Sequence, residues 1–285
     1  MSVNLNTRPS GFKIRAYFTL FRWPNGLIAG GSVLIGAAAL PTLHPFQVLL
    51  GMSCFCLLAM AGNIQNDLLD IETDRWAHPE RPLVQGTVSM RLAGWTSRSF
   101  YTIALVAAFL ISPLHFVFAC GVLVLLFVYN VWIKNIHLLG NAAVALLCAA
   151  PLYFFEWPGP PRYTWVPVAF AWLSTFIREL IKDAEDVEGD RMGGRHTYPV
   201  RYGIAATKKV VAASLALFLV VLPVPFFLKY HWTYIGIVCL IVLPLLETVR
   251  RAVYRPRPQW KQAQTTMKFL MLAGMTALLC GLLGR

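Results

Sequence analysis

The sequence predicts an all-α, polytopic membrane protein of nine transmembrane helices around a central cavity, and three observations lead to this fold class. First, 57% of the 285 residues are hydrophobic and only 13% are charged, whereas a soluble domain carries about 25% charged residues. Second, long uncharged runs recur along the chain. Third, the basic residues gather between these runs. So little charge cannot coat a water-soluble surface, so we expect the bilayer to be the solvent.

The uncharged runs divide into stretches long enough to cross a bilayer, which takes about 20 helical residues. Two runs have room for two spans each. A break divides each of them, from Pro41 to Pro45 in one and at Ser112-Pro113 in the other, because proline removes a donor and ends helices. The expected spans cover residues 20–40, 46–70, 94–112, 114–133, 138–157, 164–186, 205–228, 231–250 and 264–283.

Lysine and arginine set the expected orientation. With nine spans and a cytoplasmic N-terminus, nearly all of the 25 basic residues fall on the cytoplasmic side, in agreement with the positive-inside rule. The net charge of +12 is then mainly a topology signal, and a basic face would also attract anionic lipid and anionic substrate. Nucleic acid is not an expected partner, because the basic residues are scattered among membrane loops. No cleavable signal peptide is expected, since the first apolar stretch is too long for one.

The acidic residues form two clusters. All but two of the 13 lie between Asp67 and Glu80 or between Glu179 and Asp190, and carboxylates in or at a membrane are costly enough to indicate function. At 3.6 residues per turn, each cluster makes one stripe along a continuous helix. The stripes comprise Asn63, Asp67, Asp70 and Asp74, with Asn66 beside them, and Glu179, Asp183, Asp186 and Asp190.

The two clusters also match each other, 116 residues apart. This spacing predicts an internal pseudo-repeat, with half-repeats over residues 20–135 and 138–250 inside a single domain, 1–285. An even number of expected spans separates the clusters, so both should emerge on the cytoplasmic side of the membrane and line one cavity.

The six aspartates of the two stripes would repel each other around one cavity unless cations neutralise them. Mg²⁺ prefers oxygen ligands and usually takes one or two carboxylates plus phosphate oxygens. Arg81 follows the first cluster and Arg195 follows the second, and a guanidinium group can bind two phosphate oxygens at once. The pattern therefore indicates a substrate whose phosphate or diphosphate group is bridged by a metal ion. Because the site lies within the membrane, the rest of this substrate should be a long apolar chain.

The run from Asn66 to Asp74 resembles the NDxxDxxxD motif of the UbiA superfamily of intramembrane prenyltransferases, and the run from Asp183 to Asp190 resembles its second Asp motif. Nine spans match the family fold, so the resemblance covers nearly the whole chain. Further similarity lies at Arg81-Pro82, Lys134, Gly140-Asn141 and Thr197 to Val200.

The resemblance implies a Mg²⁺-dependent reaction in which an allylic diphosphate ionises and an acceptor attacks the carbocation. The metal ligands that it implies are Asn66, Asp67, Asp70 and Asp74 for one ion and Asp183, Asp186 and Asp190 for the other. Catalysis is expected to depend most on Asp70, Asp74, Asp186 and Asp190. The implied diphosphate ligands are Arg22, Arg81, Lys134 and Arg195. The expected substrate-binding residues are Asn25, Asn63, Tyr129 and Lys182.

The string from Arg178 to Asp190 is most similar to digeranylgeranylglyceryl phosphate synthases. This implies a geranylgeranyl diphosphate donor and a lipophilic acceptor, geranylgeranylglyceryl phosphate, within membrane lipid. Prenylation of an aromatic quinone or chlorophyll precursor stays open, because enzymes of those pathways carry similar strings. An ion-coupled transporter is the distant alternative. Transporters place ionisable residues near the bilayer midplane, whereas these clusters are expected at cytoplasmic helix ends.

Overall fold

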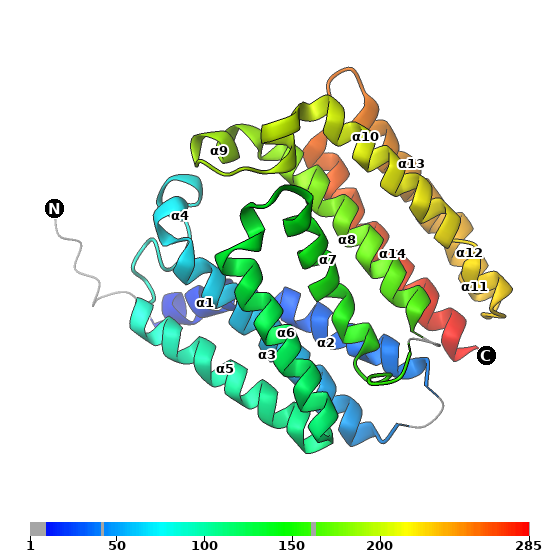
Figure 1. The fold of residues 1–285 in the computed structure, drawn as a ribbon, viewed down its shortest axis with the longest axis horizontal. Coiled ribbons are helices and arrows are strands. Elements are labelled where there is room, and N and C mark those ends of the chain that lie inside the picture. The colour runs from blue at the N-terminus through cyan, green and yellow to red at the C-terminus, as the bar shows by residue number, and fades with distance from the viewer. Residues whose placement is uncertain (1–9, 41–42, 161–163, 285) are drawn as a thin grey trace. The chain divides into compact units, whose positions relative to one another are not determined.

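A computed structural model describes residues 10–40, 43–160 and 164–284. Residues 1–9, 41–42, 161–163 and 285 lie outside the described part, and Pro41 of the predicted break is among them. Within the described ranges every regular element is a helix and no strand occurs (Figure 1). The prediction of an all-α fold is therefore confirmed.

The chain forms two compact units. Unit 1 comprises residues 1–31 and 44–131, and unit 2 comprises residues 32–43 and 132–285. One of the junctions between them, at residues 31 and 32, falls inside helix α2, which runs over Trp23–Ala38.

Unit 1 contains the first Asp cluster. Besides the start of α2, its helices are α1 (Ser10–Phe21), α3 (Pro45–Leu69), α4 (Ile71–Ala77), α5 (Met90–Ile111) and α6 (Pro113–Val131). Local sequence explains where the long helices begin. Pro45 and Pro113 stand at first helical positions, where the missing N–H is not needed. Ser89 caps α5 by accepting a hydrogen bond from the backbone nitrogen of Leu92 at 3.3 Å.

Unit 2 contains the second cluster. Besides the end of α2, its elements are the 3₁₀ turn η2 (Ile133–Asn135), α7 (His137–Tyr153), α8 (Trp165–Glu185), α9 (Val187–Met192), α10 (Tyr198–Val221), α11 (Val224–Phe227), α12 (Thr233–Ile237), the π-helical turn η3 (Val238–Val242), α13 (Leu243–Tyr254) and α14 (Trp260–Leu283). Its core lies between α8, α10 and α14. The rings of Phe170 and Phe218 are 4.8 Å apart there. Gly274 packs directly on Phe170, and a Cβ at Gly274 would lie 1.8 Å from the ring atom Cζ.

Among the described residues, six helical segments are long and apolar enough to cross a membrane: Pro45–Leu69, Met90–Ile111, Pro113–Val131, Tyr198–Phe227, Thr233–Tyr254 and Trp260–Leu283. Their outer faces are apolar as well, with Phe227 74% and Leu240 80% exposed, as lipid-facing residues should be. The protein is therefore an integral membrane protein. Of the other predicted spans, α2 and α7 are only 16 and 17 residues long, and α8 carries charged residues in its last turns. The total of nine membrane-spanning helices therefore stays a prediction.

The backbone departs from helical geometry at or next to the start of two predicted spans. The first is interrupted at Arg22, which has a φ of 48° and separates α1 from α2. In α10 the backbone leaves helical geometry at Gly203, with φ 80° and ψ 165°, a region that is essentially restricted to glycine. The regular part of this helix therefore begins near the predicted residue 205, although helical turns precede it.

The prediction of one continuous helix through each Asp cluster is wrong. α3 ends at Leu69 and α4 starts at Ile71, with Asp70 between them at φ −96° and ψ 9°. In unit 2, Asp186 separates α8 from α9 at φ −88° and ψ 4°. The two breaks fall at matching positions of the clusters, and turn-type hydrogen bonds continue across both. The Asp74 nitrogen donates to the Asp70 carbonyl and the Asp190 nitrogen to the Asp186 carbonyl, each at 2.8 Å.

Candidate active site

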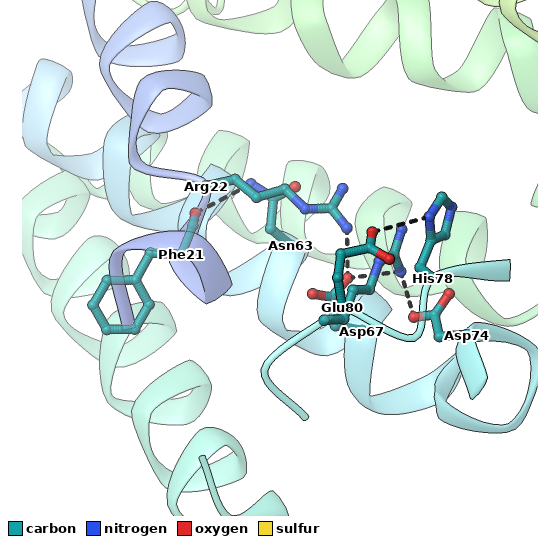
Figure 2. A network of polar contacts seen from close by, with 8 residues as sticks. Phe21, Arg22, Asn63, Asp67, Asp74, His78 and Glu80 are labelled. Atoms are coloured by element: carbon teal, nitrogen blue, oxygen red, sulfur yellow. Dashed lines mark hydrogen bonds and ion pairs between the residues drawn. The ribbon is translucent and has the colours of Figure 1, made fainter. Parts of the chain in front are cut away.

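The first Asp cluster is buried and paired with arginine. The exposed fractions of Asp67, Asp70 and Asp74 are 3%, 8% and 1%. Arg22 donates to Asp67 Oδ1 at 2.5 Å. Arg81 donates to the same oxygen at 3.2 Å and also to Asp74 Oδ2. Figure 2 shows Arg22, Asp67 and Asp74 converging at the end of α3. Buried carboxylates need such partners, because an unpaired charge away from water is costly.

Packing around the chain turns fixes both arginines. Leu20 precedes Arg22 and is fully buried with Ile64 of α3, and Leu83 follows Arg81 into the same cluster. The loop that carries Arg81 closes on itself, because the amide and hydroxyl of Thr87 both donate to the Pro82 carbonyl at 3.0 Å. The arginines are thus placed by apolar contacts on each side of the carboxylates.

More exposed polar residues surround this cluster. The Asn63 amide donates to the Phe21 carbonyl at 3.4 Å, which ties α3 to the end of α1 (Figure 2). His78 and Glu80 lie 3.4 Å apart at the surface. The hydrogen bond from Asn63 to Phe21 therefore gives Asn63 a role in joining two helices.

The second Asp cluster has mainly neutral partners. The Asn141 amide on α7 donates to Asp183 Oδ2 at 2.8 Å. The Thr197 hydroxyl donates to Asp190 Oδ2 at 3.1 Å, whereas Arg195 Nη1 lies 3.8 Å from Asp190 Oδ1. Asp183 is half-buried, Asp186 is exposed and Asp190 is buried.

Asp190 lies in α9, beyond the end of α8. Burial raises the pKa of Asp190 above its ordinary value, while the charge of Arg195 and the hydrogen bond from Thr197 act in the opposite direction. Burial prevails here because desolvation disfavours the charged carboxylate. A cation beside Asp190 would favour its ionised form.

The remaining predicted site residues have less defined surroundings. Asn66 is half-buried on α3. Asn25 is exposed in the first turn of α2, and Lys182 is exposed near the end of α8. No hydrogen bond or ion pair within the described ranges joins Asn25 or Lys182 to a carboxylate. Tyr129 near the end of α6 and Lys134 in η2 are both half-buried.

The two neutral donors, Asn141 and Thr197, were not predicted as site residues, although both lie in stretches that resemble the UbiA superfamily. Asn141 stands in an otherwise apolar helix and is 6% exposed. A carboxamide in such a helix requires a hydrogen-bond partner, and this was the available signal. Thr197 is the last residue before α10 and 9% exposed. A threonine in that position usually caps its own helix. The sequence therefore suggests a local cap and gives no sign of the hydrogen bond to Asp190.

Comparison with known proteins identifies the family. The sequence model of the UbiA prenyltransferase family matches residues 27–272. The chain belongs to the UbiA prenyltransferase family. Among relatives of this UbiA family member, the digeranylgeranylglyceryl phosphate synthase of Hyperthermus butylicus is 30% identical over 95% of this chain and 97% of the relative. The synthase of the same name from Methanoregula boonei is 31% identical over 83% of this chain and 86% of the relative.

Solved structures share the UbiA fold. A digeranylgeranylglyceryl phosphate synthase structure superposes with a TM-score of 0.76, at 24% identity, over 96% of this chain and 100% of that one. A UbiA homologue from Archaeoglobus fulgidus, bound to DMAPP and Mg²⁺, has a TM-score of 0.70 at 18% identity, over 92% and 98% of the two chains. At these sequence identities the structural similarity supports the shared fold alone.

The side chains of the clusters fit the oxygen preference of Mg²⁺. The first cluster already surrounds a cation, because the Arg81 guanidinium lies between two buried carboxylates. No group of three His, Cys, Asp or Glu side chains in the described part of the chain is arranged to hold a metal ion. Mg²⁺ differs from zinc in this respect, because it commonly binds through one or two carboxylates and completes its shell with phosphate and water.

Proposed function

We propose that this family member transfers a geranylgeranyl group from geranylgeranyl diphosphate to geranylgeranylglyceryl phosphate, a step of ether-lipid synthesis. The observation that carries the proposal is the pair of matching Asp clusters, each broken at the same position and followed by a basic loop. The choice of acceptor rests on the names of the relatives from Hyperthermus butylicus and Methanoregula boonei.

In this proposal each cluster holds one Mg²⁺. The first set of ligands is Asn66, Asp67, Asp70 and Asp74, and the second is Asp183, Asp186 and Asp190. When bound, Mg²⁺ neutralises the charge that develops on the departing diphosphate. The basic residues that contact the diphosphate are Arg22, Arg81, Lys134 and Arg195. Asp67 and Asp74 hold the guanidinium groups of Arg22 and Arg81 at the first cluster, so these two cations are already present where diphosphate would bind.

The reaction balances without a further reactant. The allylic C–O bond breaks and its electron pair leaves with the diphosphate. The acceptor hydroxyl oxygen then bonds to the allylic carbon, and its proton leaves to water or phosphate. Asn25, Asn63, Tyr129 and Lys182 are the residues we assign to orienting the substrates. Exclusion of water matters most here, because water would otherwise capture the carbocation.

The membrane topology that we propose has nine spans, a cytoplasmic N-terminus and a single domain over residues 1–285. Residues 20–135 and 138–250 would form a pseudo-repeat with one Asp cluster in each half. The identical spacing of the clusters and the matching breaks at Asp70 and Asp186 support the repeat. Basic loops between the spans support the orientation.

An acceptor screen tests the proposed activity. The purified protein would receive Mg²⁺, labelled prenyl diphosphates of several lengths, and either geranylgeranylglyceryl phosphate or aromatic quinone precursors. We expect pyrophosphate release that requires the glycerol-phosphate lipid and is highest with the geranylgeranyl donor. Turnover only with aromatic acceptors would replace the proposed acceptor. Cation flux across vesicles without any pyrophosphate release would contradict a transferase and support a transporter.

A further inference from the structure

The carboxylates of the two clusters have partners of different charge. We propose that the second cluster binds a divalent cation by itself, whereas the first cluster binds one only together with diphosphate. In this proposal Asn141 and Thr197 are positioning residues of the second site. The inference rests on the proposed function, because it assigns an order of binding to that same site.

A divalent cation that approaches the first cluster must compete with arginine. Asp67 Oδ1 accepts from both Arg22 and Arg81, and Arg81 also contacts Asp74. These are charge-assisted contacts between partly buried guanidinium groups and buried carboxylates, which are the strong class of hydrogen bond. The side chains of Asp67 and Asp74 are only 4% and 2% exposed, so water screens the competition little.

Within the described residues, no guanidinium group contacts Asp183 directly, and the charge of Lys182 acts on it only from a distance. A carboxamide has no net charge, so the hydrogen bond from Asn141 orients Asp183 without forming an ion pair with it. Thr197 acts in the same way on Asp190, and the nearest guanidinium nitrogen there is 3.8 Å away. Donors of this kind behind a ligating carboxylate fix its direction and raise metal affinity.

The placement of Asn141 is rigid. Gly140 precedes it and packs against η2, where a Cβ would lie 3.1 Å from the carbonyl oxygens of both Ile133 and Lys134. This close contact holds the start of α7 against the turn that carries Lys134. A buried carboxamide on so fixed a helix end can hold Asp183 in one orientation.

Diphosphate changes the balance at the first cluster. Its oxygens can accept from Arg22 and Arg81 in a forked geometry, which frees Asp67 and Asp74 for a cation. The diphosphate oxygens also supply ligands that a lone carboxylate pair lacks. The order that follows is one cation at the second cluster, then diphosphate with the other cation.

Binding of Mn²⁺ to the purified full-length chain, counted by electron paramagnetic resonance, tests this order. We expect one tightly bound Mn²⁺ per chain without pyrophosphate and a second after inorganic pyrophosphate is added, relative to a protein-free sample. The single ion should disappear in Asp190→Asn and persist in Asp74→Asn.

Isosteric variants separate positioning from folding. Asn141→Leu should weaken the single Mn²⁺ site by about 10–100-fold, the usual effect of removing a group behind a metal ligand. Thr197→Val should act in the same direction and serves if Asn141→Leu does not fold. Arg81→Met should let a second Mn²⁺ bind without pyrophosphate while pyrophosphate itself binds more weakly. Glu72→Gln and Glu188→Gln, at matched exposed positions beside the clusters, should leave both counts unchanged.

Three results would overturn the order: two equal Mn²⁺ sites without pyrophosphate, no Mn²⁺ bound without it, or loss of the single ion in Asp74→Asn. Failure of the proposed function has a different signature. If the order fails while Mg²⁺ and acceptor still give pyrophosphate release, the transferase assignment stands. If no pyrophosphate is released under any condition, the transferase assignment fails whatever the Mn²⁺ counts.

Discussion

The two Asp clusters share their spacing and their backbone but differ in the partners of their side chains. Asp70 and Asp186 interrupt their helices with nearly the same dihedral angles. Yet arginine neutralises Asp67 and Asp74, whereas a carboxamide and a hydroxyl orient Asp183 and Asp190. The spacing of carboxylates sets the local turn, but the partners come from other elements. Similar clusters can therefore differ in electrostatics and in their response to a metal ion.

The largest expected effect tests whether both clusters are needed for turnover. Asp70→Ala and Asp186→Ala should each lower kcat more than about 1,000-fold, because even a group behind a metal ligand is worth about 10–100-fold. Pyrophosphate release by purified protein measures this, with Glu72→Gln and Glu188→Gln as controls. Near-normal turnover in either alanine variant would remove that cluster from the site.

The next effect compares how much each cluster's partner residue contributes to the stability of the fold. Arg81→Met should destabilise the protein by about 3 kcal/mol, because two buried carboxylates lose a charged partner. Thr197→Val should cost less, about 1.5–2 kcal/mol, at the lower end of the range for a hydrogen bond to a charged group. Thermal unfolding in detergent compares the two, and added Mg²⁺ should restore part of the loss in Arg81→Met. Equal shifts would show that the two clusters do not differ electrostatically.

The smallest effect compares packing in the two units along α2. In unit 2, a Cβ at Gly36 would lie 2.2 Å from the Leu152 carbonyl oxygen. In unit 1, a Cβ at Gly26 would first meet the flexible side chain of Met60, at 2.8 Å. Gly36→Ala should therefore cost about 1–3 kcal/mol by overpacking, and Gly26→Ala should cost less. A larger loss of melting temperature in Gly26→Ala would contradict this.

Long apolar runs and proline signals made several helices predictable to within a few residues. The spans predicted at 46–70, 114–133 and 264–283 correspond to α3, α6 and α14. The short helix α1 was missed, because its sequence is not apolar enough to indicate a span. The breaks at Asp70 and Asp186 were missed as well, because the residue spacing suits a continuous helix and an interruption of one residue leaves that spacing unchanged.

By itself the sequence determined the membrane environment, the helical class, the UbiA family and the two carboxylate clusters. The environment, the helical class and the clusters depend on composition and on residue spacing, whereas the family follows from the similarity of the two Asp motifs to those of known UbiA proteins. Only the tertiary structure decided which donor meets each carboxylate. Arg22, Arg81, Asn141 and Thr197 reach their partners through chain turns and helix packing, over separations of 45, 14, 42 and 7 residues. No local pattern encodes such contacts, because each depends on the packing of other elements around it.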